Sequence, residues 1–148
     1  MIYLAGYVAP GRLTDKLTRF FTGSPVSHVE LTDGRWWLAA SWRDGGVRTK
    51  KIEEVPGHWI KVPMADGETV WHFMEQYIGA RYDLIGAITG PTTGLNLGRC
   101  EDWFCSEIMA GGQGHPKPWT VSPGAIMDGL QSRFSESASD LAKTPDMG

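Results

Sequence analysis

SHVELTDGRWWLAASW (residues 27–42) contains two apolar segments on either side of an Asp-Gly pair. Asp-Gly between such segments is a strong signal for a β-hairpin with a two-residue turn. With Asp33 and Gly34 as the turn, Leu31 is predicted to lie opposite Trp36. The hairpin is therefore the first structural unit that the sequence predicts.

One face of this hairpin carries chemically active side chains. Successive side chains of a strand point to opposite faces, so His28 and Glu30 share a face with Trp37, Ala39 and Ser41. The other face holds apolar side chains that are expected in the core: Val29, Leu31, Trp36 and Leu38. An imidazole beside a carboxylate, a hydroxyl and an indole favours a functional site. For a single histidine, the alternative is a half-exposed strand with ordinary polar residues outward.

Length and composition suit one compact domain. The chain has 148 residues, 41% of them hydrophobic, and a net charge of −3. These values leave enough apolar material for a core and argue against a nucleic-acid binder that works through a broad basic surface. No apolar segment approaches the length of a membrane span. The short apolar start of the chain lacks a basic leader, so we expect a cytoplasmic location, with virion association as the alternative.

Further strands and helices are predicted around the hairpin. Strands are expected at 2–8, 45–55 and 58–64, helices at 13–21, 67–79 and 101–112, a turn or short helix at 82–88, and a glycine-rich loop at 90–98. The polar segment 132–148 is expected to be a flexible tail after a single domain at 1–131. The predicted fold class is α+β, with an antiparallel sheet of about five or six strands packed against helices.

Cys105 is predicted to lie at the start of a helix. The segment EDWFCSE (101–107) places it in the first turn, where the partial positive charge of the helix N-terminus favours a thiolate. A strand histidine facing such a cysteine is the arrangement that cysteine hydrolases need. The alternative is that Cys105 is a small buried hydrophobic residue. Cys100 is expected to be structural and not joined to Cys105, and the other histidines show no metal-ligand spacing.

Several short segments occur in the order that one enzyme family uses. They are SHVEL (27–31), DGGVR (44–48), YDLIG (82–86) and FCSE (104–107), followed by SP (122–123). This set resembles the circularly permuted papain-like cysteine hydrolases, the permuted branch of the NlpC-type cell-wall peptidase superfamily, to which the lecithin–retinol acyltransferase group is related. Short members are familiar from bacteriophages and prophages. The resemblance covers residues 1–127, and the order of the segments is more specific than any one of them.

The resemblance implies a thiol hydrolase of permuted papain-like fold, with Cys105 as the nucleophile and His28 as the general base. Related proteins often carry a polar or acidic residue on the strand after the histidine strand, where this chain has alanines. The third catalytic residue is therefore open between Glu30 and Ser41. We prefer Glu30, because a carboxylate stabilises an imidazolium better than a hydroxyl does. No metal or other cofactor is implied.

Substrate-binding residues are also expected near this pair: Trp37, Ser41, Tyr82 and Asp83. Tyr82 and Asp83 match a family motif near the cleft, and their alternative roles are a packed ring and a helix cap. The expected substrate is a peptide, a muropeptide or an acyl compound, with no nucleic-acid partner. The sequence predicts no oligomeric state. A second function is a catalytically weak binding or virion structural module that retains the fold.

Overall fold

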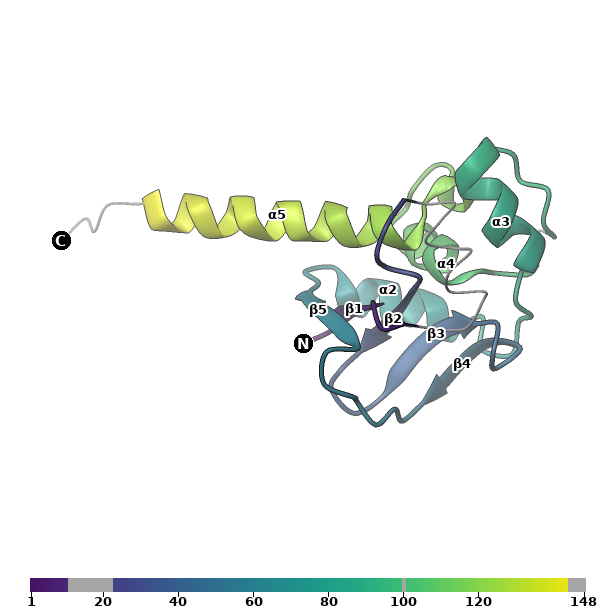
Figure 1. Ribbon diagram of the computed structural model, residues 1–148, viewed down its shortest axis with the longest axis horizontal. Helices are drawn as coiled ribbons and strands as arrows, with labels where there is room; N and C mark the ends of the chain where they lie inside the picture. Colours follow the sequence, from purple (N-terminus) through teal and green to yellow (C-terminus); the bar gives the residue numbers. More distant parts are fainter. Residues whose placement is uncertain (11–22, 100, 144–148) are drawn as a thin grey trace.

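The structure is a computed structural model that describes residues 1–10, 23–99 and 101–143 (Figure 1). Two predictions, the helix at 13–21 and the structural role of Cys100, lie outside the described residues. Five antiparallel strands form one sheet in the order β4-β3-β2-β1-β5. The strands are β1 (Tyr3–Tyr7), β2 (His28–Thr32), β3 (Trp37–Ser41), β4 (Gly46–Lys50) and β5 (Trp59–Pro63). The predicted α+β class with an antiparallel sheet is confirmed.

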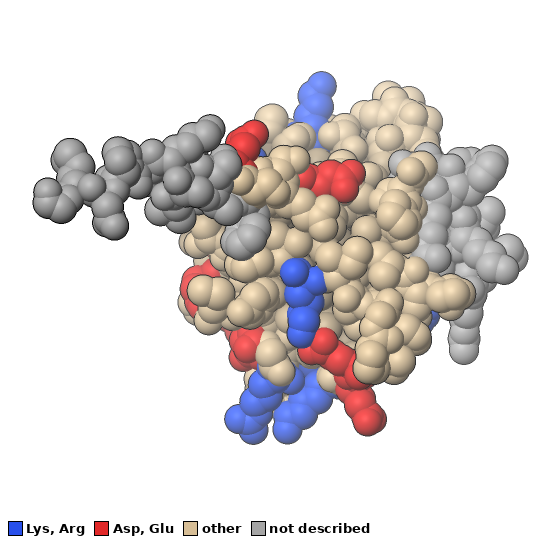
Figure 2. Space-filling view, turned by 60° about the vertical axis from the view of Figure 1, so that its left-hand side comes forward, with Lys and Arg blue, Asp and Glu red and all other residues tan. Residues whose placement is uncertain are grey.

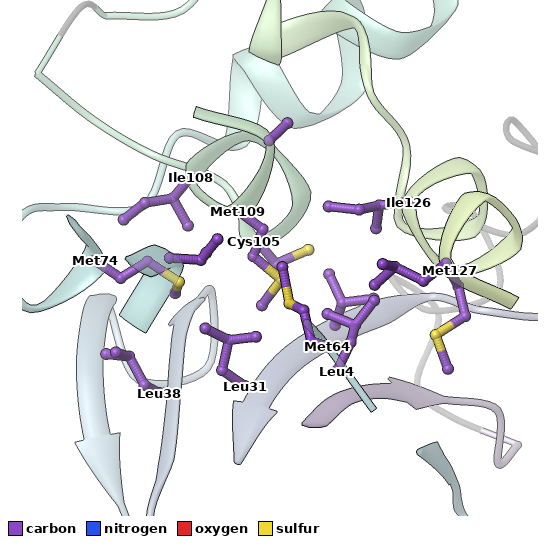
Figure 3. Close-up of a cluster of buried hydrophobic side chains, with 14 of the residues drawn as sticks. Leu4, Leu31, Leu38, Met64, Met74, Cys105, Ile108, Met109, Ile126 and Met127 are labelled. Atoms are coloured by element: carbon purple, nitrogen blue, oxygen red, sulfur yellow. The ribbon is translucent and has the colours of Figure 1, made fainter. Parts of the chain in front are cut away.

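Helices cover one face of this sheet. The helices of the described residues are α2 (Gly67–Glu75), α3 (Leu84–Thr93), α4 (Cys105–Gly112), the 3₁₀ turn η1 (Pro118–Thr120) and α5 (Pro123–Lys143), and those that pack on the strands are α2, α4 and α5. Apolar side chains of α2, α4 and the first part of α5 pack against alternate residues of the strands, including Leu4, Leu31 and Leu38 (Figure 3). The burial of this apolar surface is the main source of stability. The helix-covered face is called the inner face below.

The hairpin loop is longer than predicted. Leu31 pairs with Leu38 and Thr32 with Trp37, so the loop spans the four residues 33–36 and the predicted pairing of Leu31 with Trp36 is wrong. The Asp33 carboxylate accepts hydrogen bonds from the backbone N–H groups of residues 35 and 36, which stabilises the wider loop. Trp36 is 41% exposed and does not join the core. The shift is two residues, so the strand residues keep their predicted faces.

Two C-terminal predictions also change. Helix α3 continues through Pro91 to Thr93, into the segment predicted as a loop, and ends at Gly94 in a left-handed conformation. Helix α5 continues to Lys143, so the segment predicted as a flexible tail from 132 is helical to that residue and projects from the body of the molecule (Figure 1). No glycine or proline interrupts residues 130–143, which permits the continuous helix.

The other face of the sheet, called the outer face, is covered by a chain segment. Strands β4 and β5 are the two edges of the sheet, so the segment 51–58 that joins them must cross its whole width. None of the helices in the described part of the chain is both long and apolar enough to span a bilayer. In the view of Figure 2, acidic and basic side chains lie close together in small groups, and the described residues visible there form no broad basic area.

Candidate active site

His28 and Glu30 lie on the outer face of β2, as the alternation of the strand predicts. Nε2 of His28 is 3.0 Å from Oε1 of Glu30. Only 3% of the Glu30 side chain is exposed, against 19% of the His28 side chain. The two residues therefore form a buried, hydrogen-bonded pair. This contact leaves Nδ1 as the ring nitrogen available to a second partner.

Glu30 has a second partner that the sequence analysis missed. Two guanidinium nitrogens of Arg48, on β4, donate to the Glu30 carboxylate at 3.0 and 2.8 Å. Nε of the same guanidinium donates to Asp44 at 2.6 Å, and Lys50 also donates to Asp44 at 2.7 Å. Two-point contact of a guanidinium fixes both the position and the orientation of a carboxylate. Arg48 lies in segment 44–48, one of the segments that match the family pattern. Its position on the outer face of β4 was the signal that could have identified it from the sequence.

Cys105 is the first residue of α4. Its thiol lies near the His28 ring and near the backbone N–H groups of Val29 and Ser106, close enough for these groups to change its pKa. Only 3% of the residue is exposed, and apolar core side chains surround it (Figure 3). The prediction of a cysteine at a helix start beside His28 therefore agrees with the geometry, and so does the prediction of a buried cysteine.

The contacts between these three residues change their pKa values. Burial alone lowers the pKa of His28, but the Cys105 sulfur and the Glu30 carboxylate outweigh it and raise that pKa to about 10. Burial opposes ionisation of Cys105 as well, yet the imidazolium and two backbone N–H groups lower its pKa. Burial raises the pKa of Glu30, and the hydrogen bonds from His28 and Arg48 reverse this and lower it to about 2. The charged forms of all three are therefore favoured together.

Tyr82 is held beside the same sulfur by a close approach of two chain segments. The N–H of Val47 donates to the carbonyl of Ala80 at 2.9 Å, and a Cβ at Gly46 would overlap that carbonyl oxygen. The neighbouring Tyr82 hydroxyl lies near the Cys105 sulfur. Burial and the adjacent sulfur raise the pKa of Tyr82, so the hydroxyl keeps its proton.

Asp83 takes the structural role that the sequence left open for it. Its side chain accepts a hydrogen bond from the N–H of Gly86 at 2.8 Å and caps helix α3. Asp83 is 5% exposed and does not line the cavity that contains His28. Its predicted contact with substrate is therefore not supported, because the helix N-terminus already uses the carboxylate.

Trp37 differs from its predicted role, whereas Ser41 does not. Trp37 is 1% exposed, and its ring packs against Trp59 at a centroid distance of 4.8 Å, so it is a packing residue and not a substrate contact. Ser41 lines the cavity as predicted. Its hydroxyl lies near Asp44 and helps to lower the pKa of that carboxyl group, whereas the group hydrogen-bonded to the His28 ring is Glu30. Between the two candidates for the third residue, the geometry favours Glu30.

A cavity of about 380 Å³ opens onto His28 and Glu30 from the outer face. Its walls include aromatic residues that the sequence analysis did not select: Tyr7, Trp42 and Trp59. Within residues 1–10, 23–99 and 101–143, no three His, Cys, Asp or Glu side chains are grouped so that they could hold a metal ion. The cavity and the Cys105–His28–Glu30 group together form the candidate active site.

A further ionisable group lies beneath this site. Glu107, on the first turn of α4, is 6% exposed and accepts a hydrogen bond from the N–H of Phe104 at 3.4 Å. Burial, with a smaller contribution from the nearby Asp83 carboxylate, raises the pKa of Glu107 to about 7. This carboxyl group therefore changes charge near neutral pH.

No family model, curated protein or solved structure matches this chain. The functional assignment therefore rests on the residues, their geometry and the order of the segments along the sequence.

Proposed function

We propose that this protein is a cysteine hydrolase that cleaves an amide or an ester. The observation that carries the proposal is that His28 is hydrogen-bonded to Glu30 through Nε2 and lies close enough to the Cys105 thiol for the two groups to change each other's pKa. An imidazole between a thiol and a carboxylate is the general arrangement of an activated nucleophile, its base and an orienting group. Because the charged forms of Cys105 and His28 are favoured, the sulfur is a thiolate before substrate binds.

The chemistry follows from these charges. The Cys105 thiolate attacks the carbonyl carbon, and the electron pair of the C=O bond moves to its oxygen. Protonated His28 then gives its proton to the leaving amine or alcohol as the C–N or C–O bond breaks, which leaves a thioester. Water attacks the thioester, His28 takes the water proton, and the acid departs with return of the thiolate. The Tyr82 hydroxyl and the N–H groups at the start of α4 are the nearby donors for the oxyanion.

The order of motifs supports the same proposal. The histidine segment precedes the cysteine segment, as in the permuted papain-like hydrolases that the chain resembles, and the α+β architecture is compatible with that family. A peptide, a muropeptide or an acyl ester remains the proposed range of substrates, with a bacteriophage context suggested by the resemblance. The order of segments is the only link to that context.

The burial of Cys105 favours a second candidate. A cysteine residue that is only 3% exposed is poorly accessible to a substrate carbonyl, and most free cysteines are simply buried hydrophobic residues. On this alternative, the chain is a binding or virion structural module that retains the fold without efficient catalysis. The two candidates differ in whether Cys105 is needed for an observable reaction.

Hydrolysis assays with peptidoglycan fragments, peptides and activated acyl esters test the proposal. The wild type is expected to hydrolyse at least one class, and Cys105→Ala and His28→Gln are expected to abolish that activity while the thermal unfolding curves stay similar. Activity that persists in Cys105→Ala would contradict the proposal. No hydrolysis of any class, together with an ordinary thiol at Cys105, would favour the binding module.

Two further variants test the orienting residue. Glu30→Gln keeps the shape of the side chain and loses its charge, so turnover is expected to fall on the order of 10²-fold. Ser41→Ala is expected to change turnover little, because the Ser41 hydroxyl lies near Asp44 and the His28 ring is hydrogen-bonded to Glu30. The reverse order of effects would assign the orienting role to Ser41.

A further inference from the structure

The floor of the cavity is the outer face of the sheet. Tyr7 on β1 and Trp59 on β5 are paired residues, and their rings meet at a centroid distance of 5.0 Å. Both line the cavity, and His28, which pairs with Tyr7 in the sheet, lies beside them. A ligand on these two rings therefore lies next to the proposed catalytic base.

The remaining walls are also largely apolar. The crossing segment 51–58 contributes Ile52 and Val55, and α3 contributes Leu84, Ala87 and Ile88. Three of these are strongly exposed for their type, because Val55 is 49%, Leu84 38% and Ile88 52% accessible. Exposed apolar side chains gathered at one concave site are typical of a ligand-binding surface.

The rim formed by α3 carries no charge. Residues 84–98 read LIGAITGPTTGLNLG, without a single Asp, Glu, Lys or Arg. A solvent-facing helix ordinarily carries charged side chains on its open side. The uncharged stretch includes the part of α3 that borders the cavity, which makes this border suited to an apolar ligand and poorly suited to a charged one.

The charged groups on the sheet floor of the cavity are already paired. Glu30 is bonded to His28 and Arg48, and Lys50 is bonded to Asp44. A ligand that bound to Glu30, Arg48 or Lys50 by charge would have to displace one of these short contacts. The cavity volume of about 380 Å³ lies at the lower end of the range for small-molecule sites, about 300–1,000 Å³. It suits one compact apolar group better than an extended polymer.

We propose that this cavity binds an apolar group of the substrate, an alkyl chain or an aromatic ring, attached next to the bond that is cleaved. Describing the ligand as a substrate rests on the proposed hydrolase function. The binding of an apolar group is argued only from the residues that line the cavity. It narrows the substrate class to esters or amides with an apolar substituent. Small hydrophilic esters and amides are poor substrates on this account.

A kinetic experiment tests the proposal with two series of esters. One series lengthens the acyl chain from acetate to decanoate, and the other lengthens the alcohol over the same range. In one of the two series, kcat/KM is expected to rise roughly two- to fourfold per added methylene until the cavity is full. The series that responds identifies the side of the scissile bond that enters the cavity. Hydrolysis that is independent of chain length in both series would overturn the proposal.

Two isoleucines on α3 provide a matched pair of variants. Ile88 lines the cavity and Ile85 does not, although they are 52% and 60% exposed on the same helix. Ile88→Gln is expected to reduce the dependence on chain length, and Ile85→Gln is expected to leave it unchanged. Equal effects of the two substitutions would contradict a role of the cavity wall.

Binding to an inactive variant separates this proposal from the proposed function. Cys105→Ala is titrated with alkanoates and with 1-alkanols of increasing length, and tryptophan fluorescence is recorded because Trp42 and Trp59 line the cavity. The affinity in at least one series is expected to rise with length and to fall in the added Ile88→Gln variant. If the wild type hydrolyses nothing and this binding is still observed, the proposed function fails and the apolar site stands. Binding that ignores chain length in both series overturns the site.

Discussion

The inner and outer faces of strand β2 are both buried, but they are built from different groups. On the inner face, Leu31 is fully buried and belongs to the apolar cluster that the helices cover. On the outer face, the adjacent residue Glu30 is 3% exposed and bonded to His28 and Arg48. The comparison teaches that a single strand can contribute to an apolar core and to a polar site at once, because its successive side chains point to opposite faces.

The two faces also differ in what a substitution removes. An inner-face side chain contributes through the apolar area it buries and the cavity it would leave. An outer-face side chain contributes through charges that are stable only while every partner is present. Substitutions on the inner face should therefore change stability alone, and those on the outer face should change both stability and the site.

The largest effect on stability is expected on the inner face. Leu31→Ala should lower the free energy of unfolding by about 4 kcal/mol, since Leu31 is fully buried. Denaturant unfolding measures this change, and Leu95→Ala at a 58% exposed position is the control. Similar losses for the two variants would show that the inner face is not the core of the fold.

On the outer face, Arg48→Met is expected to cost about 3 kcal/mol, because it leaves the buried Glu30 carboxylate with one charged partner instead of two. The Glu30 pKa should rise from about 2. The stability that ionised Glu30 contributes is present above its unfolded-state pKa and is lost as pH falls through its folded-state pKa. In the variant, this acid loss should therefore be smaller and should be complete at a higher pH.

Lys50→Met provides the control for this comparison. Lys50 bonds to Asp44, as Arg48 does, but it makes no contact with Glu30 and its side chain is 41% exposed. Its removal should cost less than about 1 kcal/mol. If Lys50→Met were as damaging as Arg48→Met, the contact with Glu30 would not be the reason for the loss.

A smaller effect, of opposite sign, is expected at Glu107. Its pKa is about 7 in the folded protein against 4.5 for a free glutamate, so the folded state binds more protons between these values. Stability should therefore fall as pH rises through this window. Glu107→Gln should remove the fall and stabilise the protein by roughly 2 kcal/mol above pH 7, which is less than the full value of about 1.4 kcal/mol per pH unit between 4.5 and 7 because solvent screens part of the charge. The exposed Glu68→Gln is the control for the loss of one carboxylate.

The sequence predicted the faces of the strands better than their pairing. His28, Glu30 and Ser41 kept their predicted face although the hairpin register moved by two residues, because the side-chain period of a strand is also two. Trp36 was misplaced because the Asp33 carboxylate stabilises a four-residue loop, which the Asp-Gly signal does not distinguish from a two-residue turn.

Parts of the site depend on contacts that sequence patterns do not encode. Arg48 reaches Glu30 across the sheet, which requires the pairing of β4 with β3 to be known. The cavity exists because the segment 51–58 crosses the outer face, and Trp59 enters it from the far edge strand. Local periodicity carries no information about such crossings. The position of Cys105 at a helix start was predicted because the flanking acidic residues and glycines mark a helix locally.

The most direct test of the central claim is the titration of the Cys105 thiol. In a Cys100→Ser background, the ultraviolet absorbance of the thiolate is followed against pH, which requires no access of a reagent to the buried sulfur. The account predicts a midpoint below the value of an ordinary cysteine, about 8.5, because His28 and the N–H groups lower the Cys105 pKa. The midpoint should rise in the added His28→Gln variant. A midpoint at or above the ordinary value, unchanged by His28→Gln, would contradict the thiolate–imidazolium pair.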